Sequence, residues 1–153
     1  MPEHPQLETL PDWPTKTIAV LATGDPAPYA IPVSAPVRAG DRRILLSLKR
    51  SRGSLARLRT RPQVALLILT ADDIAFTARG SARVVEEAMK VAPDYGAVEI
   101  EVEHIDDHRQ AEFLVESGID RRWVDEDEQH ALRERVAALG ELTTTRGQVP
   151  GRT

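Results

Sequence analysis

The stretch at residues 47–62, SLKRSRGSLARLRTRP, holds six basic residues and no acidic one. Within it, Ser51 is suited to cap the start of a short helix, because its hydroxyl can accept a hydrogen bond from a backbone N–H group of the first turn. Such a helix start favours an anion, since its N–H groups carry partial positive charge. Arg52 and Ser54 would add donors, and Gly53 would let a ligand approach the backbone. The stretch therefore predicts a site for a phosphate group.

Two other interpretations of this basic stretch have to be weighed against a phosphate site. A solvated helix face, with arginine stems lying over apolar surface, explains the same residues and stays open. A nucleic-acid partner usually requires a basic domain with aromatic residues for stacking. The whole chain instead has a formal net charge of -4 and 4% aromatic residues. We therefore expect no nucleic-acid partner.

Histidine and serine residues give weaker indications of chemistry. His104 and His108 have the i, i+4 spacing of a helical zinc motif. A strand is predicted to end at His104 and a helix to begin after it, so the two imidazoles would not share a helical face. Neither Ser34 nor Ser47 has a histidine and an acid near it in the sequence that would indicate a nucleophilic triad. We therefore predict no metal site and name no catalytic residue.

The composition indicates what kind of molecule holds these residues. With 153 residues, 41% of them hydrophobic and 29% charged, the chain is long enough for one globular domain. It has no cysteine, which suits a reducing compartment. The N-terminus shows no signal peptide, and no apolar run approaches the ~20 residues that cross a bilayer. We expect a cytoplasmic protein with no membrane partner.

The first two thirds of the chain is predicted to be β-structure. Short apolar or alternating runs bounded by turn residues are typical of strands. Prolines at 32 and 36 indicate that the second strand lies at an edge, is bulged, or turns unpaired groups toward a ligand. Gly80 indicates a bulge or a close approach to the backbone in the fifth. Alternating acids at 99, 101 and 103 indicate a solvent-exposed face on the sixth. The six predicted strands cover residues 17–23, 29–37, 43–48, 64–70, 74–85 and 97–104.

The remainder of the chain is predicted to be helical. Asp107, with a glutamine three residues later, and Asp125, with a glutamate three residues later, each have the spacing of a capping box. The first helix is expected to end at Gly118 and the second at Gly140. We divide the chain into an N-terminal segment (1–16), a β core (17–104), helices packed on that core (105–142) and a disordered tail (143–153).

A series of short motifs runs in order through the predicted β core: LAT at 21–23, IPVS at 31–34, ILLS at 44–47, SR at 51–52, Leu58, PQVAL at 62–66 and RGSARV at 79–84. Their order and spacing resemble the pyridoxamine 5′-phosphate oxidase-like, FMN-binding split-barrel family. The resemblance spans roughly residues 17–104. It implies a six-stranded antiparallel split β-barrel with C-terminal helices, forming a homodimer that binds flavin mononucleotide (FMN) in the groove between two barrels.

The resemblance also implies which residues hold the cofactor. Ser34 and Ser47 are expected to hydrogen-bond the isoalloxazine edge. The lysine that the family usually places near the phosphate is replaced here by Ser54, so Arg50, Arg52 or Arg57 would have to supply that charge. The predicted cofactor-binding residues are Pro32, Val33, Ser34, Ser47, Leu48, Arg50, Ser51, Arg52, Ser54 and Arg57.

A flavin-dependent oxidoreductase, acting on a small-molecule substrate with a separate electron donor, is the function that the resemblance implies. In such a protein the cofactor carries the redox chemistry, while the protein positions it. Three alternatives stay open at this point. The barrel could bind a deazaflavin, whose longer acidic tail would suit the surplus of positive charge, or it could bind haem. It could also be a non-enzymatic dimeric module with a degenerate flavin site.

Overall fold

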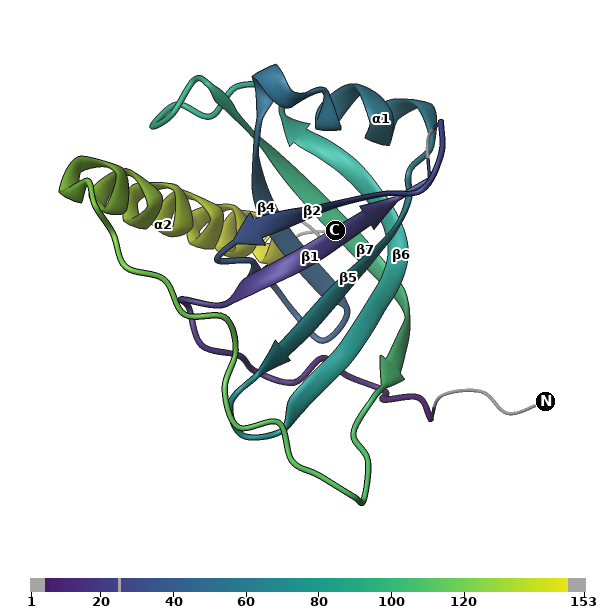
Figure 1. Ribbon diagram of the computed structural model, residues 1–153. Helices are drawn as coiled ribbons and strands as arrows, with labels where there is room; N and C mark the ends of the chain where they lie inside the picture. The colour runs from purple at the N-terminus through teal and green to yellow at the C-terminus, as the bar shows by residue number, and fades with distance from the viewer. Residues whose placement is uncertain (1–4, 25, 149–153) are drawn as a thin grey trace.

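One antiparallel sheet of seven strands dominates the computed structural model, which describes residues 5–24 and 26–148 (Figure 1). A 3₁₀ turn, η1 (Arg50–Arg52), and a short helix, α1 (Ser54–Thr60), join the fourth strand to the fifth, and a long helix, α2 (Glu126–Gln148), follows the sheet. The predicted fold class, a mainly β antiparallel split barrel with helical structure at its C-terminal end, is confirmed. The strands are β1 (Ile18–Thr23), β2 (Tyr29–Ser34), β3 (Val37–Arg38), β4 (Arg43–Lys49), β5 (Gln63–Thr70), β6 (Ile74–Glu86) and β7 (Tyr95–Asp107).

The strand count is seven instead of the predicted six because the second predicted strand is broken. The predicted strand at 29–37 forms β2, which ends at Ser34, and the two-residue β3. Between them, Ala35 has a φ of 55°, a left-handed conformation that interrupts an extended chain. Pro36 follows, and it has no N–H group to donate to a neighbouring strand. The other five predicted strands are each present as one strand, with ends shifted by at most three residues.

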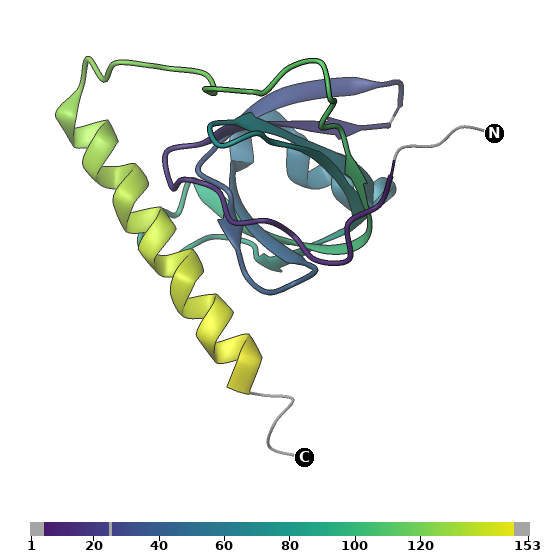
Figure 2. The same cartoon turned by 90° about the horizontal axis from the view of Figure 1, so that it is seen from below.

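The sheet curls until its two ends meet without pairing. Its hydrogen-bonded order is β2-β1-β5-β6-β7-β4-β3, so β2 and β3 are the edge strands. β2 lies in contact with β4, but no ladder joins the two within the described part of the chain, and Figure 2 shows the resulting ring from one end. The edge position predicted for the strand with Pro32 is confirmed. We call the line between β2 and β4 the seam.

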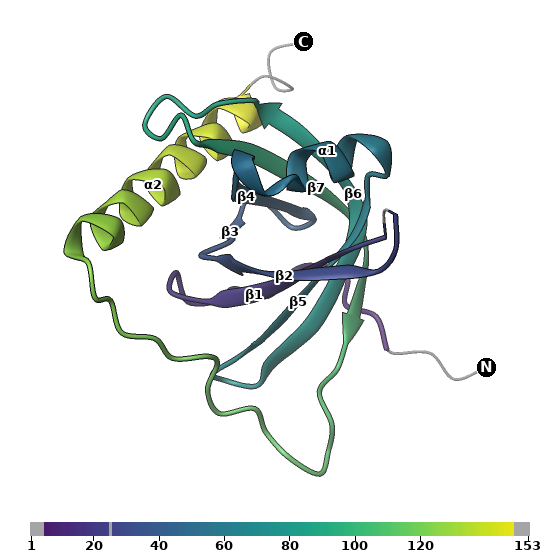
Figure 3. The same ribbon diagram turned by 45° about the horizontal axis from the view of Figure 1, so that its top comes forward.

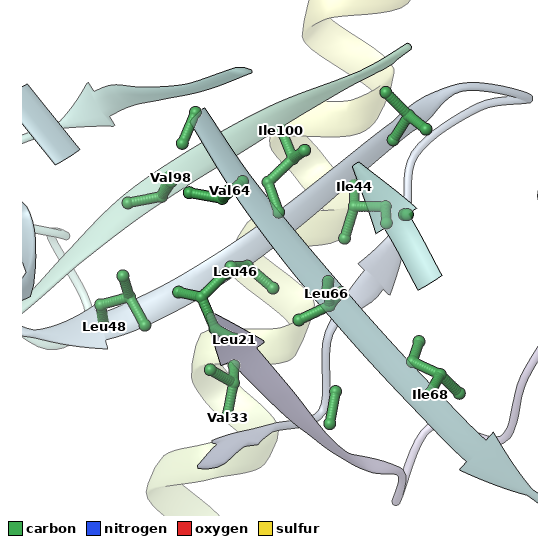
Figure 4. Close-up of a cluster of buried hydrophobic side chains, with 14 of the residues drawn as sticks. Leu21, Val33, Ile44, Leu46, Leu48, Val64, Leu66, Ile68, Val98 and Ile100 are labelled. Carbon is green, nitrogen blue, oxygen red and sulfur yellow. The ribbon is translucent and has the colours of Figure 1, made fainter. Parts of the chain in front are cut away.

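Aliphatic side chains fill the inside of the barrel. Leu21, Val33, Leu46 and Leu66 come from four different strands and meet there, each with at most 3% of its surface exposed (Figure 4). A side chain of this size contributes about 1.5–3 kcal/mol when it is fully buried. Trp13 of the N-terminal segment packs against the same core. The curled sheet is therefore a rigid frame for side chains that point out of it at the seam.

Gly80 marks an irregular pairing between β6 and β7. The register of the two strands shifts between Arg79 and Gly80. A Cβ atom at position 80 would lie 2.0 Å from the carbonyl oxygen of Glu101, so no residue with a side chain fits there without a backbone shift. The predicted bulge and close approach at Gly80 are both confirmed.

The helix α2 covers part of the outside of the barrel. It packs on β3 and β4, where Leu139 joins Leu45 of β4 in a second buried cluster. Glu99 of β7 lies opposite Leu45 in the sheet and is only 4% exposed. The predicted solvent-exposed face of the last strand is therefore wrong at Glu99, although the acids at 101 and 103 are exposed.

The start of α2 is as predicted, but its end is not. The Asp125 carboxylate accepts hydrogen bonds from two backbone N–H groups of the first turn, at 2.9 and 3.4 Å, which confirms Asp125 as the cap of this helix. The helix continues through Gly140 to Gln148, because Leu142 still packs on the second cluster. The predicted disordered tail is thus helical as far as residue 148, and its last residues, 149–153, lie outside the described residues. None of the described helices is long and apolar enough to cross a membrane.

The helix predicted to begin at Asp107 is absent, because β7 runs on to that residue. Residues 108–125, which we call the strap, run irregularly from β7 to the start of α2 (Figure 3). The Asp107 carboxylate accepts from the backbone and the guanidinium of Arg109, and does not cap a helix. Val115 exchanges hydrogen bonds of 2.9 Å with Asp73, at the turn after β5. These contacts hold the strap extended against the barrel.

Candidate functional site

A cavity of about 570 Å³ lies at the seam. Its walls come from β2 and β4, from the residues around the start of α1, and from the strap and α2. Cavities of this size accommodate small molecules and cofactors. We call it the seam cavity. Seven of the ten predicted cofactor-binding residues line it, namely Pro32, Val33, Ser34, Ser47, Leu48, Arg52 and Ser54.

The other three predicted residues do not line the seam cavity. Arg50 turns its guanidinium to the carbonyl of Pro93, at 3.1 Å. Ser51 is exposed within η1. Arg57 lies over the ring of Tyr29, 4.0 Å from its centroid. Of the three arginines considered for the phosphate charge, only Arg52 is therefore placed in the cavity wall.

The prediction that Ser51 caps the helix is wrong, because the N-cap residue of α1 is Gly53, two residues later. Residues 50–52 form a 3₁₀ turn, and α1 begins at Ser54 after Gly53. Gly53 has a φ of 77°, in the left-handed region where glycine meets no steric penalty. The turn at Gly53 changes the direction of the chain, so that Arg52 and the buried Ser54 both reach the cavity from consecutive segments.

The lining of the seam cavity is strongly cationic. Lys49, Arg52, Arg121 and Arg135 stand against one acidic residue, Glu128, so the formal charge of the lining is four minus one, or +3. Opposite charge in a partly desolvated cavity favours a bound anion. The charge of this region supports the predicted anion site, although only one of these four cations was among the predicted residues.

Arg121 of the strap is one residue that sequence reasoning missed. Its guanidinium donates a hydrogen bond to the Ser34 hydroxyl at 2.9 Å. Desolvation lowers the pKa of Arg121, but an arginine stays protonated at neutral pH. It also lies 4.4 Å from the ring centroid of Trp123. No local motif marks Arg121, because only the path of the strap brings it to β2.

Arg135 of α2 is the second missed residue, and it is 7% exposed. Its guanidinium carbon lies 3.8 Å from the ring centroid of Tyr95, which also lines the seam cavity. A signal for Arg135 was present in the sequence. It stands on the apolar helix face of Leu132 and Leu139, at spacings of three and four residues. A charged side chain in the middle of an apolar helix face indicates either a buried partner of opposite charge or a ligand-binding site.

A second cavity, of about 560 Å³, adjoins the first. It lies between the strap and α2, and we call it the strap cavity. Apolar side chains such as Trp123, Leu132 and Val136 form much of its wall. Arg121 lines both cavities. The strap and α2 therefore make a continuous border from the cationic seam cavity to a more apolar space.

The described histidines lie away from the seam cavity. Among residues 5–24 and 26–148, none of those that line it is a histidine. The Nε2 atom of His108 lies 2.7 Å from the Thr77 hydroxyl, and His104 is exposed on β7. Within residues 5–24 and 26–148, no group of three or more metal-ligating side chains comes together.

The chain was compared with protein families, curated proteins and solved structures, and only solved structures are similar to it. No protein-family model matches the chain, and no curated protein matches it. A candidate pyridoxamine 5′-phosphate oxidase of Listeria innocua superposes with a TM-score of 0.51 at 15% identity, over 61% of this chain and 90% of that one. HupZ of Group A Streptococcus gives 0.50 at 15% identity, over 69% and 90%.

An F420 reductase gives a TM-score of 0.50 at 12% identity, over 61% of this chain and 91% of that one. At such identities the similarity establishes the fold alone. In each of these structures the similar region covers most of the other protein, so the whole of a small split barrel is shared. This chain therefore has the fold of the pyridoxamine 5′-phosphate oxidase-like split barrels.

Proposed function

We propose that the protein binds FMN in the seam cavity and acts as a flavin-dependent oxidoreductase on a small-molecule substrate. The observation that carries this proposal is the convergence of Ser34, Ser47, Arg52 and Ser54 on one cavity. These residues come from three segments of the chain, and each lies in a motif that predicted a cofactor site from the sequence. The residue types also fit the group, since a flavin combines a flat ring, polar ring atoms and one phosphate.

The phosphate is proposed to bind between Arg52 and Ser54. A guanidinium offers two parallel N–H donors to a phosphate, and a hydroxyl offers a third. Ser54 is 4% exposed, so its hydroxyl is held in place by the surrounding side chains. Arg52 is exposed and is free to close on a bound phosphate. This arrangement replaces the point charge of a lysine with a forked donor.

The ring is proposed to lie along the seam. Ile31, Val33 and Leu48 supply apolar wall, which excludes water from a bound ring. The hydroxyls of Ser34 and Ser47, which line the cavity, would hydrogen-bond its polar edge. When bound, the flavin supplies the redox chemistry, while the side chains bind, orient and desolvate it.

A homodimer is part of this proposal. β2 is an edge strand with its hydrogen-bonding groups available on one side, and Tyr29 on it is 45% exposed although it borders the cavity. A second barrel packed against β2 would cover this side of the seam and bury the exposed tyrosine. Such a partner would convert an open cavity into a groove between two subunits.

A deazaflavin is the second candidate ligand. Four cations line the seam cavity, which is more than one phosphate requires, and one of the structures with this fold is an F420 reductase. Haem has less support, because no histidine lines the cavity. A degenerate, non-enzymatic site is the remaining alternative, and the absence of a lysine at Ser54 is the observation in its favour.

Titration of the purified protein with FMN, and separately with a deazaflavin, tests the proposal through visible absorption and flavin fluorescence. We expect Arg52→Ala to weaken FMN binding by about 1.5–3 kcal/mol, the range for a hydrogen bond to a charged group. Arg50→Ala is the matched control, because the Arg50 side chain points to Pro93, and it should leave FMN affinity unchanged.

Wild-type protein that takes up neither cofactor would contradict the proposed function. Tighter binding of the deazaflavin than of FMN would favour the second candidate. Equal FMN affinity in wild type and Arg52→Ala would move the phosphate away from the start of α1.

A further inference from the structure

Arg135 is a buried charge without a protein counter-charge. It is 7% exposed, and its Nε atom has no hydrogen-bond partner within the described residues. None of the ion pairs in that part of the chain involves it. Its one described interaction is the stack on Tyr95. Buried charged groups are normally paired or hydrogen-bonded, because desolvation disfavours an isolated charge.

The groups around Arg135 do not supply the missing charge. Lys49, Arg52 and Arg121 line the same cavity and repel it. Glu128, the acidic residue of the lining, stands two helical turns earlier on α2 and makes no ion pair with Arg135 within the described residues. The guanidinium therefore faces a cavity that already has an excess of positive charge. An anion inside that cavity would satisfy it.

We infer that Arg135 binds an oxyanion of a second small molecule in the seam cavity, separately from the phosphate held by Arg52. The chemistry that fits is a carboxylate or a phosphate, since both offer two oxygens to the planar fork of a guanidinium. The inference rests on the proposed function, because the second molecule would be the substrate or the electron donor of the cofactor site. Beyond the proposed function, it states that this molecule is an anion.

The position of Arg135 supports a site separate from the one at Arg52. Arg52 reaches the cavity from the turn before α1, whereas Arg135 reaches it from α2, which packs on β3 and β4. Tyr95 lies against the Arg135 guanidinium, and this contact restricts the guanidinium. A fixed guanidinium loses less freedom on binding an anion than a mobile one does. The arrangement is thus suited to recognise an oxyanion.

Substitution by methionine separates a binding role from a structural one. Arg135→Met keeps an unbranched side chain of similar length but removes the buried charge. If Arg135 is there to bind a ligand, the Tm of the ligand-free variant stays at or rises above the wild-type Tm, because an unpaired buried charge is removed. If the stack on Tyr95 is there to hold α2 in place, the Tm falls.

Anion binding is measured by calorimetry with inorganic phosphate and with acetate as separate probes, on protein loaded with FMN where FMN binds. The two arms distinguish a phosphate site from a carboxylate site. We expect Arg135→Met to weaken binding of the preferred probe at least tenfold, and Arg135→Lys, which keeps the charge without the fork, to weaken it less. Arg50→Ala is the matched control, because the Arg50 guanidinium points to the Pro93 carbonyl and does not line the seam cavity, and it should change anion binding by less than about twofold.

Two results would overturn the inference. One is equal binding of both probes by wild type and Arg135→Met. The other is a loss of FMN affinity in Arg135→Met as large as that in Arg52→Ala, which would make Arg135 part of the cofactor site. The proposed function is tested independently: wild type that takes up no FMN but binds an anion through Arg135 refutes the function and supports the inference.

Discussion

Two buried charges lie on the side of the barrel that α2 covers, and their surroundings are opposite. Glu99 is 4% exposed, and Arg43 and Arg83 both donate hydrogen bonds to its carboxylate, the latter at 2.7 Å. Arg135 is 7% exposed and has no carboxylate partner in the described part of the chain. One charge is neutralised by the protein itself, and the other is not.

The difference separates a charge that has protein partners from one that, by our inference, binds a ligand. Removing one member of a buried ion pair leaves the other uncompensated and strongly destabilises a protein. Removing an unpaired buried charge relieves a desolvation cost. Substitutions at Glu99 and at Arg135 are therefore expected to change the free energy of unfolding in opposite directions, although both side chains are charged and buried in the same part of the molecule.

The largest effect is expected at Glu99. Glu99→Gln should lower the free energy of unfolding by about 2–3 kcal/mol, less than for a fully buried pair because the Arg83 side chain is exposed. Denaturant unfolding measures this change. Glu101→Gln, an exposed position on the same strand, is the matched control and should be near neutral. Equal stability of the two variants would show that the buried Glu99 carboxylate does not stabilise the fold and would contradict its assignment as a structural charge.

A smaller effect is expected at a second paired acid, Asp106. Hydrogen bonds from Arg79, at 2.8 and 3.1 Å, lower its pKa against an opposing desolvation effect, and Gln6 also lowers it. A carboxyl with a lowered pKa stabilises the fold above its unfolded pKa of about 3.9 and loses that contribution as the pH falls through its folded value.

Asp106→Asn should therefore cost about 1 kcal/mol at neutral pH, because the Arg79 side chain is half exposed. Its stability should also fall less steeply than that of wild type when the pH drops below about 4. Thermal unfolding as a function of pH measures both. A variant with the same acid dependence as wild type would show that this pair contributes nothing measurable.

The smallest effect on stability is expected from giving Arg135 an internal partner. Ala131→Glu places a carboxylate four residues before Arg135 on α2, where the two side chains face each other and gain about 0.3–0.5 kcal/mol. The same carboxylate should occupy the guanidinium and weaken binding of the anion probe. Ala137→Glu, two residues after Arg135, faces another direction and is the control. Unchanged anion binding in Ala131→Glu would place the anion away from Arg135.

Strands were predictable from the sequence because their signals are local. Alternation, short apolar runs and turn residues identified all the strand segments, and even Gly80 was informative. The break at Ala35 was not predictable, since a positive φ at an alanine is imposed by the surrounding fold. The failure at Asp107 has a similar cause. Its carboxylate had a local partner in Arg109, and the apolar residues that follow it are consecutive instead of spaced for a helix face.

The cavity was predictable only where it is built from contiguous segments. The residues from β2, β4 and the basic stretch were named because they lie within motifs. Arg121, Tyr95 and Arg135 were missed because the strap, β7 and α2 bring them to the seam from distant parts of the chain. The sequence shows Arg135 as a charged residue on an apolar helix face, but this pattern does not identify a cavity residue until the neighbours of that face are known.

The two tryptophans give the protein a natural spectroscopic contrast. Trp13 is fixed in the core, 5.7 Å from the ring of Phe76, with its indole N–H bonded to the Pro36 carbonyl at 2.8 Å. Trp123 lies under Arg121, whose other contact is Ser34 of the seam. Emission from Trp13 is therefore a constant background, while that of Trp123 depends on where Arg121 sits. The chain thus contains an optical probe one side chain away from the seam cavity.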